Sequence, residues 1–173
     1  MKIWVFEIEK RGLSYIRLGI STALLIFGLL LLIAPILEPP NTVNFGENGI
    51  VGSFEHASNI SHMQNPVSRA IYTFGDWECH QHASRSFFIN GNQMPVCARC
   101  TAIFLSISFT AFLLVFIRIK APFWVIIALI IPMALDGGIQ LITPYESNNI
   151  LRFITGSLAG FATVLAFDSI IED

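Results

Sequence analysis

Three cysteines and two of the four histidines gather in one short stretch of the chain. A Cys-His pair stands at 79–80, and a Cys-x-x-Cys pair follows at 97–100. Thiolate sulfur and imidazole nitrogen are ligands that zinc prefers, and two such pairs complete a tetrahedral site. We therefore interpret zinc as the candidate cofactor and four residues as its candidate ligands: Cys79, His80, Cys97 and Cys100.

The same Cys-x-x-Cys pair suits a different chemistry. If 97–100 opens a helix, the helix N-terminus lowers the pKa of the thiols, and this spacing supports a reversible disulfide. The chain is then a thiol-disulfide oxidoreductase, and a Cys-x-x-Cys pair at the start of an apolar span resembles that of the bacterial thiol oxidases, which implies a quinone as the electron acceptor. The cysteine spacing alone leaves metal binding and thiol redox chemistry both open.

An acidic residue stands inside an apolar segment, where charge is costly. Asp136 and Gln140 are spaced i, i+4 and share one face of a helix that also contains Pro132. An aspartate at mid-membrane costs roughly 2.5–3.5 kcal/mol on insertion scales, so it is by default a functional candidate. Asp136 is a candidate general base, a candidate proton or cation ligand of a small transporter, or a group that fastens helices through an arginine.

Arginines and amides flank the same segments. Arg85 and Arg99 lie close to the cysteines in sequence, and Arg152 follows Asn148 and Asn149. The guanidinium fork matches phosphate and carboxylate groups, so these residues favour an anionic lipid headgroup or a lipid-linked substrate. The alternative is that each arginine only reaches toward water or neutralises a nearby acid.

The composition places these groups in a membrane protein. The chain is 54% hydrophobic and only 13% charged, with a mean hydropathy of +0.65, whereas a soluble domain carries about a quarter charged residues. The formal net charge of −2 gives no excess of basic residues for binding nucleic acid, and we expect no such partner. The partner indicated by the composition is membrane lipid.

Four apolar runs approach the roughly 20 residues that cross a bilayer as a helix. They cover 15–37, 97–119, 122–143 and 150–171. The sequence therefore predicts an all-α integral membrane bundle of four transmembrane helices, forming a single domain over 1–173. The first run is longer than a secretory signal and ends without a small-residue cleavage site, so we expect it to remain as an anchor.

Basic residues beside the runs set the expected orientation in the cell membrane. Lys10 and Arg11 precede the first run and Arg17 lies at its start, and Arg118 and Lys120 lie where the second run meets the third. Because basic residues favour the cytoplasmic side, we expect both termini in the cytoplasm. The cysteines, Asp136 and Arg152 then belong to the extracellular side.

The connection 38–96 forms the expected outer elaboration. Its first part, 39–64, is polar and without periodicity, which predicts a solvated loop in which His56 and His62 are solvated. Asn65-Pro66 then provides a helix cap and a first-turn proline. An apolar stripe of period 3.6 follows and predicts a short amphipathic helix that lies at the membrane interface or packs over the bundle: Val67, Ala70, Ile71 and Phe74.

The chain resembles a family of small prokaryotic membrane proteins known only as domain of unknown function 2085. The resemblance covers roughly the C-terminal two thirds and implies that the matching residues act together as one site. These residues are Cys79-His80-Gln81, Arg85-Ser86-Phe87-Phe88, Gly91, Gln93-Met94-Pro95-Val96-Cys97-Ala98-Arg99-Cys100, Asp136-Gly137, Gln140, Ser147-Asn148-Asn149, Arg152 and Thr155-Gly156.

The leading hypothesis is a membrane protein whose outward-facing Cys/His metal site binds or processes an anionic lipid or lipid-linked substrate. In an enzyme of this kind, Asp136, Gln140 and Arg152 are the candidate catalytic residues. Substrate binding is expected from a second group: Arg85, Arg99, Asn148 and Asn149. The alternatives are the quinone-linked oxidoreductase, which lacks here the second cysteine pair of such enzymes, and the transporter.

Overall fold

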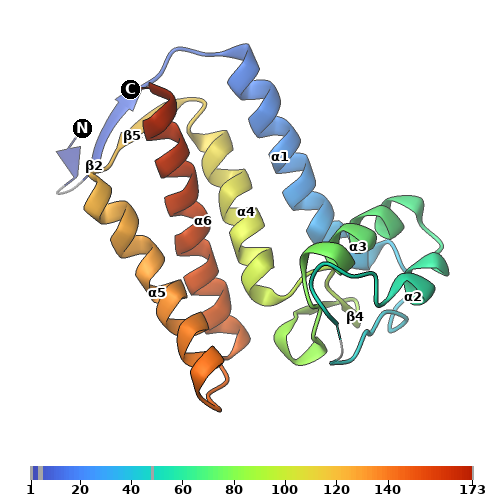
Figure 1. Cartoon of the computed structure of the whole chain (residues 1–173). Coiled ribbons are helices and arrows are strands. Elements are labelled where there is room, and N and C mark those ends of the chain that lie inside the picture. Colours follow the sequence, from blue (N-terminus) through green and yellow to red (C-terminus); the bar gives the residue numbers. More distant parts are fainter. Residues whose placement is uncertain (1, 4–5, 48, 173) are drawn as a thin grey trace. The chain divides into compact units, whose positions relative to one another are not determined.

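The computed structural model describes residues 2–3, 6–47 and 49–172, and they are mainly helical (Figure 1). The helices are α1 (Tyr15–Ile33), η1 (Ala34–Ile36), α2 (Ala57–Ser61), α3 (Pro66–Glu78), η2 (Ala83–Arg85), α4 (Ala98–Leu113), α5 (Phe123–Ile142) and α6 (Asn149–Glu172), where η marks a 3-10 helix. The strands are β1 (Lys2–Ile3), β2 (Phe6–Lys10), β3 (Phe88–Ile89), β4 (Asn92–Gln93) and β5 (Ile117–Lys120).

Three of the four expected spans have helices of the right length. Among the described residues, Tyr15–Ile36, Phe123–Ile142 and Asn149–Ile171 are long and apolar enough to cross a membrane. The prediction of a helix over 97–119 is wrong at its C-terminal end, because α4 stops at Leu113. Its 16 residues rise about 24 Å at 1.5 Å per residue, less than the roughly 30 Å of hydrocarbon.

The end of the expected second span is a β-strand instead. β5 pairs antiparallel with β2, and β1 adds a third strand on the other edge of β2. Glu7 lies opposite Lys120 and Glu9 opposite Arg118, and Lys120 Nζ lies 2.8 Å from a Glu9 carboxylate oxygen. Alternating isoleucine and basic residues in β5 match the alternating acids of β2, so pairing between distant segments overrides the helical pattern.

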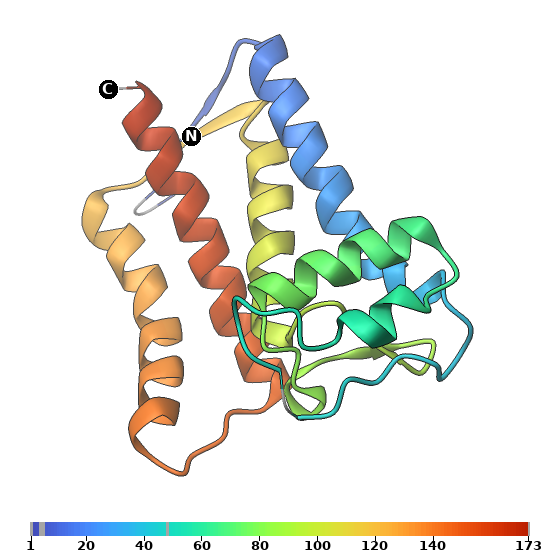
Figure 2. The same cartoon turned by 45° about the vertical axis from the view of Figure 1, so that its right-hand side comes forward.

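The chain divides into two compact units, residues 28–101 and residues 1–27 with 102–173. In the second of these units α5 and α6 run side by side, as Figures 1 and 2 both show. Its buried core contains Leu114, Ile126, Ala162 and Leu165. Ile117 and Ile119 of β5 pack against that core, so the apolar residues of the strand face the core of the unit.

Close approach between α4 and α6 in the same unit depends on small residues. Ser106 Oγ donates a hydrogen bond to the Ser157 carbonyl oxygen at 2.7 Å. One turn further along, a Cβ on Gly160 would lie 2.6 Å from the Ile103 carbonyl oxygen, which is backbone and has little room to move. Small residues at such crossings are typical of helix packing in membranes.

Replacing Gly160 by alanine is therefore expected to separate α4 from α6. We expect the melting temperature in detergent to fall by roughly 3–8 °C, since overpacking costs about 1–3 kcal/mol. Gly138→Ala is the matched control, because a Cβ on this helical glycine of α5 meets nothing within 4 Å. An equal loss in both variants, measured by thermal unfolding, would contradict the packing argument.

The unit 28–101 contains the expected short helix, now α3. Asn65 caps it as predicted, its side chain accepting hydrogen bonds from the Val67 and Ser68 backbone N–H groups, and Pro66 occupies the first turn. The buried face differs from the expected apolar stripe, because Val67 and Ala70 are exposed. The buried residues are Ser68, Ile71, Tyr72, Gly75 and Asp76, three of which have polar side chains with hydrogen-bond partners elsewhere in the unit.

Most described residues of the stretch 39–64 are exposed, as its composition predicts, but a few apolar side chains are anchored in the unit. Val43, Phe45 and Ile60 are buried, and Ile60 lies in α2. The buried amides of Asn92 and Gln93 accept hydrogen bonds from the backbone N–H groups of 42, 43 and 45 at 2.8–2.9 Å. Partners 48 to 50 residues away therefore satisfy the backbone that local structure leaves unpaired.

Candidate metal centre

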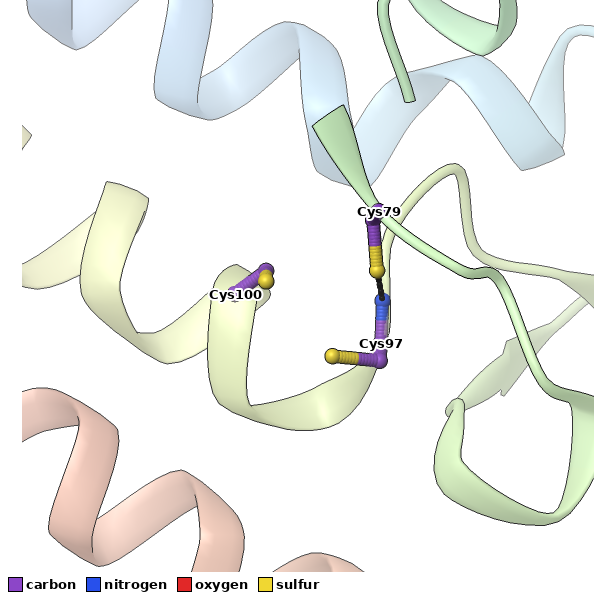
Figure 3. A group of neighbouring side chains, drawn as sticks. All are labelled: Cys79, Cys97 and Cys100. Carbon is purple, nitrogen blue, oxygen red and sulfur yellow. Dashed lines mark hydrogen bonds between the residues drawn. The ribbon is translucent and has the colours of Figure 1, made fainter. Parts of the chain in front are cut away.

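Two backbone segments of the unit 28–101 carry the three cysteines. Cys79 ends α3 in an extended conformation, and its N–H donates to the Gly75 carbonyl oxygen at 2.9 Å. Cys97 directly precedes α4, and Cys100 lies in the first turn of that helix. Figure 3 shows the three side chains converging, and their Sγ atoms all lie within 4.8 Å of one another.

The cluster consists of free thiols in a protected position. Cys79 and Cys97 are buried and Cys100 is partly exposed. The Cys97 backbone N–H donates to Cys79 Sγ at 3.2 Å, the dashed line in Figure 3. Hydrogen bonds with the Cys100 and then the Cys79 thiol lower the pKa of Cys97, whereas hydrogen bonds with neighbouring thiols and burial raise the pKa of Cys79 and of Cys100, so one of the three sulfurs is favoured as the thiolate.

These distances suit a zinc ion. A zinc–sulfur bond of about 2.3 Å in a tetrahedron places two sulfurs about 3.8 Å apart. The sulfurs here lie within 4.8 Å of one another, so small side-chain rotations bring them to that spacing. The donor set of three thiols fits a soft or borderline metal such as zinc better than magnesium or calcium, which take oxygen ligands.

Two buried glutamines connect the segment of Cys79 to the segment of Cys97. Gln81 Nε2 donates to the Pro95 carbonyl oxygen at 2.6 Å, and Gln93 Nε2 donates back to the Gln81 carbonyl oxygen. Tyr72 of α3 adds a hydrogen bond of 2.5 Å from its hydroxyl to the Gln93 carbonyl oxygen. Gln81 and Gln93 are fully buried, so this network holds the two cysteine segments in register without solvent.

The backbone conformation of Gln81 and the absence of a side chain at Gly75 also contribute to this arrangement. Gln81 has a φ of +42°, in the left-handed region that non-glycine residues rarely occupy. Gly75 lies directly against the Pro95 carbonyl group, so that any Cβ on it would overlap that oxygen. Both features bring α3 close to the segment that leads into α4.

The structure places the predicted fourth ligand, His80, outside the three-cysteine cluster. Among the described residues, the group whose ligand atoms converge contains only Cys79, Cys97 and Cys100. The ring of His80 packs edge-on against that of His82, with centroids 4.8 Å apart. His82 Nδ1 in turn lies 3.3 Å from a Glu47 carboxylate oxygen.

The predicted catalytic residues belong to the unit that contains α5 and α6. Asp136 of α5 is buried and Gln140, one turn later, is partly buried. Arg152, in the first turn of α6, is only 3% exposed, and its NH1 donates to Asn149 Oδ1 at 3.1 Å. The helical hairpin formed by α5 and α6 therefore contains one buried acidic residue, Asp136, and one buried basic residue, Arg152.

The predicted substrate-binding residues divide between the units. Arg85 in η2 and Arg99 in α4 belong to 28–101 and are partly exposed, whereas Asn148 and Asn149 belong to the other unit. The Asn148 side chain accepts a hydrogen bond from the Leu151 N–H at 2.8 Å and so caps the start of α6. That structural role was readable from the sequence, since asparagine is a preferred helix cap.

A buried histidine was missed by the sequence argument. His56 is 5% exposed, which corrects the expectation that it is solvated, and its Nδ1 lies 2.8 Å from Asp76 Oδ1. The same carboxylate accepts a hydrogen bond from the His56 backbone N–H at 3.1 Å. Twenty residues separate the pair, so spacing offered no signal, whereas His62 is exposed as expected.

Comparison with known proteins identifies relatives in archaea. An uncharacterized protein of Methanocaldococcus jannaschii, MJ1492, is 40% identical over 116 residues, which cover 64% of this chain and 74% of the relative. An uncharacterized protein of Methanothermobacter thermautotrophicus is 45% identical over 86 residues, covering 47% and 77%. No solved structure matches the chain.

The family match confirms the resemblance seen in the sequence. It spans residues 79–166, from the first cysteine to the last part of α6, and so includes all three cysteines, Asp136 and Arg152. The segment before Cys79 lies outside the match. With this match covering half of its length, the chain belongs to the family described as predicted membrane protein (DUF2085).

Proposed function

We propose that this membrane protein binds one zinc ion through Cys79, Cys97 and Cys100. The observation that carries the proposal is the convergence of three free thiols within 4.8 Å, from two segments that a buried network holds together. Cysteines that lie near one another in sequence need not bring their sulfur atoms together in the fold. The cluster also contains no exposed carboxylates, which often gather on protein surfaces without binding a metal. A bound zinc ion would supply Lewis acidity at this position.

Three protein ligands leave one tetrahedral position for another group. Catalytic zinc sites keep that position for water or substrate, whereas structural sites fill it with a fourth side chain. His80 is the nearest candidate by sequence, but it is not a member of the cluster. We therefore propose an open position that accepts an anionic oxygen ligand, with Arg99, which lies between Cys97 and Cys100 in sequence, balancing the negative charge of three thiolates.

The proposed ligand is an anionic lipid or a lipid-linked substrate. Three candidate spans and membership of a membrane protein family support an amphiphilic ligand over a soluble one. We assign Asp136 the role of general base, oriented by Gln140, and Arg152 the role of anion clamp. Burial of both charged groups in the α5–α6 hairpin supports this assignment, because such groups in membrane helices mark functional sites.

We place the termini in the cytoplasm and the metal centre outside. Pairing of β2 with β5 and the ion pair of Arg11 with Asp168, at 2.8 Å, gather the N-terminal segment, the α4–α5 connection and the last turns of α6 at one end of their unit. This clustering supports a common side for both termini. The basic residues at that end favour the cytoplasmic side.

Metal content decides between the two uses of the cysteines. Elemental analysis of protein purified in detergent is expected to find about one zinc per chain, with all three thiols free after denaturation. Protein without metal that contains a Cys97–Cys100 disulfide would reject the zinc proposal.

That second result would favour the thiol oxidoreductase, the other function that an observation supports. Cys97 and Cys100 lie at the start of α4, where a helix N-terminus activates a thiol. In this case the two thiols form one disulfide and release two electrons and two protons, which reduce a quinone to a quinol. Quinone reduction by the thiol-reduced protein is the direct assay.

Neighbouring histidines provide a matched test of the open position. We expect His80→Ala and His82→Ala to retain the same zinc affinity, measured by competition with a chelator dye. A loss of about tenfold or more in His80→Ala alone would identify His80 as the fourth ligand and the site as closed and structural.

Cobalt substitution tests the ligand class. The visible absorption of Co²⁺ depends on its coordination geometry, so a ligand entering an open position changes the spectrum. We expect phosphatidic acid, which carries a terminal phosphate, to change the spectrum of the cobalt-loaded protein in detergent, and phosphatidylcholine to leave it unaltered. Identical spectra with both lipids would contradict an anionic lipid at the metal.

A further inference from the structure

A small cavity lies in the unit 28–101, apart from the three cysteines. Its volume is about 230 Å³, and its lining residues all belong to the stretch 38–64. None of the predicted metal, catalytic or substrate-binding residues is among them, and the whole lining precedes the family match, which begins at residue 79. Sites for drug-sized ligands have roughly 300–1,000 Å³, so this cavity suits a smaller group.

The lining contains one buried acid, Glu38. This residue is only 4% exposed, and its two carboxylate oxygens accept hydrogen bonds from the Gln64 and Asn65 backbone N–H groups, both at 3.1 Å. In the part of the chain that the structure describes, no lysine, arginine or histidine forms an ion pair with this carboxylate. Each oxygen keeps a second lone pair, so the group can accept further hydrogen bonds.

The surroundings of Glu38 are more acidic than basic. The segment 28–101 contains five acidic residues, three arginines and no lysine. None of these arginines lines the cavity, and Arg69, one turn beyond Asn65 in α3, donates to the Met63 carbonyl oxygen at 3.2 Å. A buried charge without a counter-ion is costly. A cationic ligand in the cavity would offset this cost.

The other polar side chains of the lining offer further hydrogen-bond acceptors. Within the described residues, no hydrogen bond occupies the side-chain amides of Asn59 and Gln64. His62 Nδ1 lies 2.7 Å from the Ser58 carbonyl oxygen, so in the neutral ring Nδ1 carries the proton and Nε2 remains an acceptor. The cavity therefore combines one negative charge with oxygen and nitrogen acceptors.

These groups favour one class of cation over two others. Calcium takes roughly six to eight oxygen ligands, often from several carboxylates, whereas Glu38 is the one carboxylate of this lining. A quaternary ammonium has no N–H group and is bound by aromatic cages, whereas the one phenyl ring here, Phe45, is itself only 5% exposed. A primary ammonium group has three N–H donors, which match the carboxylate and the amide oxygens.

Glu38 also lies close to a membrane surface. It follows the candidate span Tyr15–Ile36 by two residues, and an extended chain covers at most about 3.6 Å per residue. The residue is therefore no more than about 7 Å beyond the end of that span. Headgroups occupy roughly 5–8 Å on each side of the hydrocarbon core. The buried acid thus lies at the depth where lipid headgroups are found.

We propose that this cavity binds a primary ammonium group at Glu38, carried by the ethanolamine headgroup of a phospholipid or by a small soluble amine. The carboxylate supplies the charge, and the amides of Asn59 and Gln64 accept the remaining N–H groups. The site uses no residue of the zinc centre, so it is independent of the function proposed above.

Two pairs of probes test the site on protein purified in detergent. Dioleoyl phosphatidylethanolamine and dioleoyl phosphatidylcholine share a phosphate and differ in having a primary or a quaternary nitrogen. In native mass spectrometry, we expect the wild type to retain phosphatidylethanolamine about fivefold better than phosphatidylcholine. Glu38→Gln is expected to lose this preference, and Glu55→Gln, which removes an exposed acid outside the lining, is expected to keep it.

Ethanolamine and choline are the second pair and distinguish the two sources of the ammonium group. They differ in the same nitrogen but carry no phosphate or acyl chain, and their binding is measured by calorimetry. A preference within the lipid pair supports a headgroup as the ligand. A preference for ethanolamine over choline without one in the lipid pair supports a small soluble amine in the same site.

Filling the cavity tests where the amine binds. Asn59→Phe fills the cavity while Glu38 and its two N–H partners remain, and Asn59→Leu is the smaller replacement. Ser58→Phe adds the same ring at a neighbouring exposed position outside the lining. We expect the Asn59 variants to lose the preferred probe at least about threefold relative to Ser58→Phe. These variants keep the proposal testable if Glu38→Gln does not fold.

Any of three results would overturn the proposal. One is a wild type without preference in either pair of probes, and another is an unchanged preference in folded Glu38→Gln. The third is full binding in both Asn59 variants, which would place the amine outside the cavity. Every variant is expected to keep about one zinc per chain, so zinc content and melting temperature separate these results from failure of the metal centre.

Discussion

Replacing Cys97 by serine is expected to reduce bound zinc from about one ion per chain to below about one tenth. Cys97 contacts both of the other ligands. Its backbone N–H donates a hydrogen bond to Cys79 Sγ, and its thiol is hydrogen-bonded to the Cys100 thiol. A serine hydroxyl is a much weaker zinc ligand than a thiolate, and two remaining thiolates do not hold the ion against a chelator. Elemental analysis after dialysis measures the loss.

The control for this variant is Thr101→Ser. Thr101 lies in the first turn of α4, just after Cys97, and is 1% exposed. Its hydroxyl donates to the Val96 carbonyl oxygen, a bond that serine preserves. This variant is expected to keep its zinc. Retention of zinc by Cys97→Ser at the wild-type level would show that the metal lies elsewhere or that the cluster does not bind metal.

The same site predicts the effect of pH. Protons compete with the metal for the thiolate sulfurs, so zinc affinity falls as the pH falls. The pKa of Cys97 is lowered, whereas the pKa values of Cys79 and Cys100 are raised, so protons compete mainly at the latter two sulfurs. We therefore expect zinc to be released gradually on acidification, and a zinc content independent of pH would argue against thiolate ligands.

Replacing Gly75 by alanine is expected to destabilise the unit 28–101 by about 3 kcal/mol and to weaken zinc binding with it. A Cβ at this position would overlap the Pro95 carbonyl oxygen and would lie 2.9 Å from Gln81 Nε2. Both groups belong to the network that positions Cys79 against Cys97. Thermal unfolding and zinc competition in detergent measure the two losses.

Gly19→Ala is the control for the glycine substitution. Gly19 is an exposed helical residue of α1, and a Cβ there meets nothing within 4 Å. This variant is expected to unfold at the wild-type temperature or slightly above it, since alanine favours helix. If Gly75→Ala keeps both stability and zinc affinity, the close contact between α3 and the segment before Cys97 is not what forms the site.

Several features followed from sequence because their physical cause is local. The apolar runs at 15–37, 122–143 and 150–171 predicted the three helices that are long enough to span a bilayer. Asn65 and Pro66 predicted the start of α3, because a side-chain cap and a first-turn proline act within one helical turn. The clustering of cysteines at 79–100 predicted that these three side chains meet, although the predicted set also contained His80.

Other features depended on partners far along the chain. The segment Ile117–Lys120 continues an apolar run that predicts a helix, yet it forms a strand because β2, more than 100 residues earlier, offers acids that face its basic residues. His56 is buried because Asp76 accepts its hydrogen bonds, and the backbone at Thr42 and Phe45 is held because the side chains of Asn92 and Gln93 accept its hydrogen bonds.

The metal centre itself shows the same division. Residue types and the Cys-x-x-Cys spacing were sufficient to select the cysteines, because ligand chemistry depends on the atoms alone. Which ligands meet was decided by tertiary structure, since the separation of Cys79 from Cys97 depends on Gln81, Gln93 and the contact of Gly75 with Pro95. Hydrogen bonds and close packing between segments distant in sequence leave no periodic signal, and they brought together three sulfurs without His80.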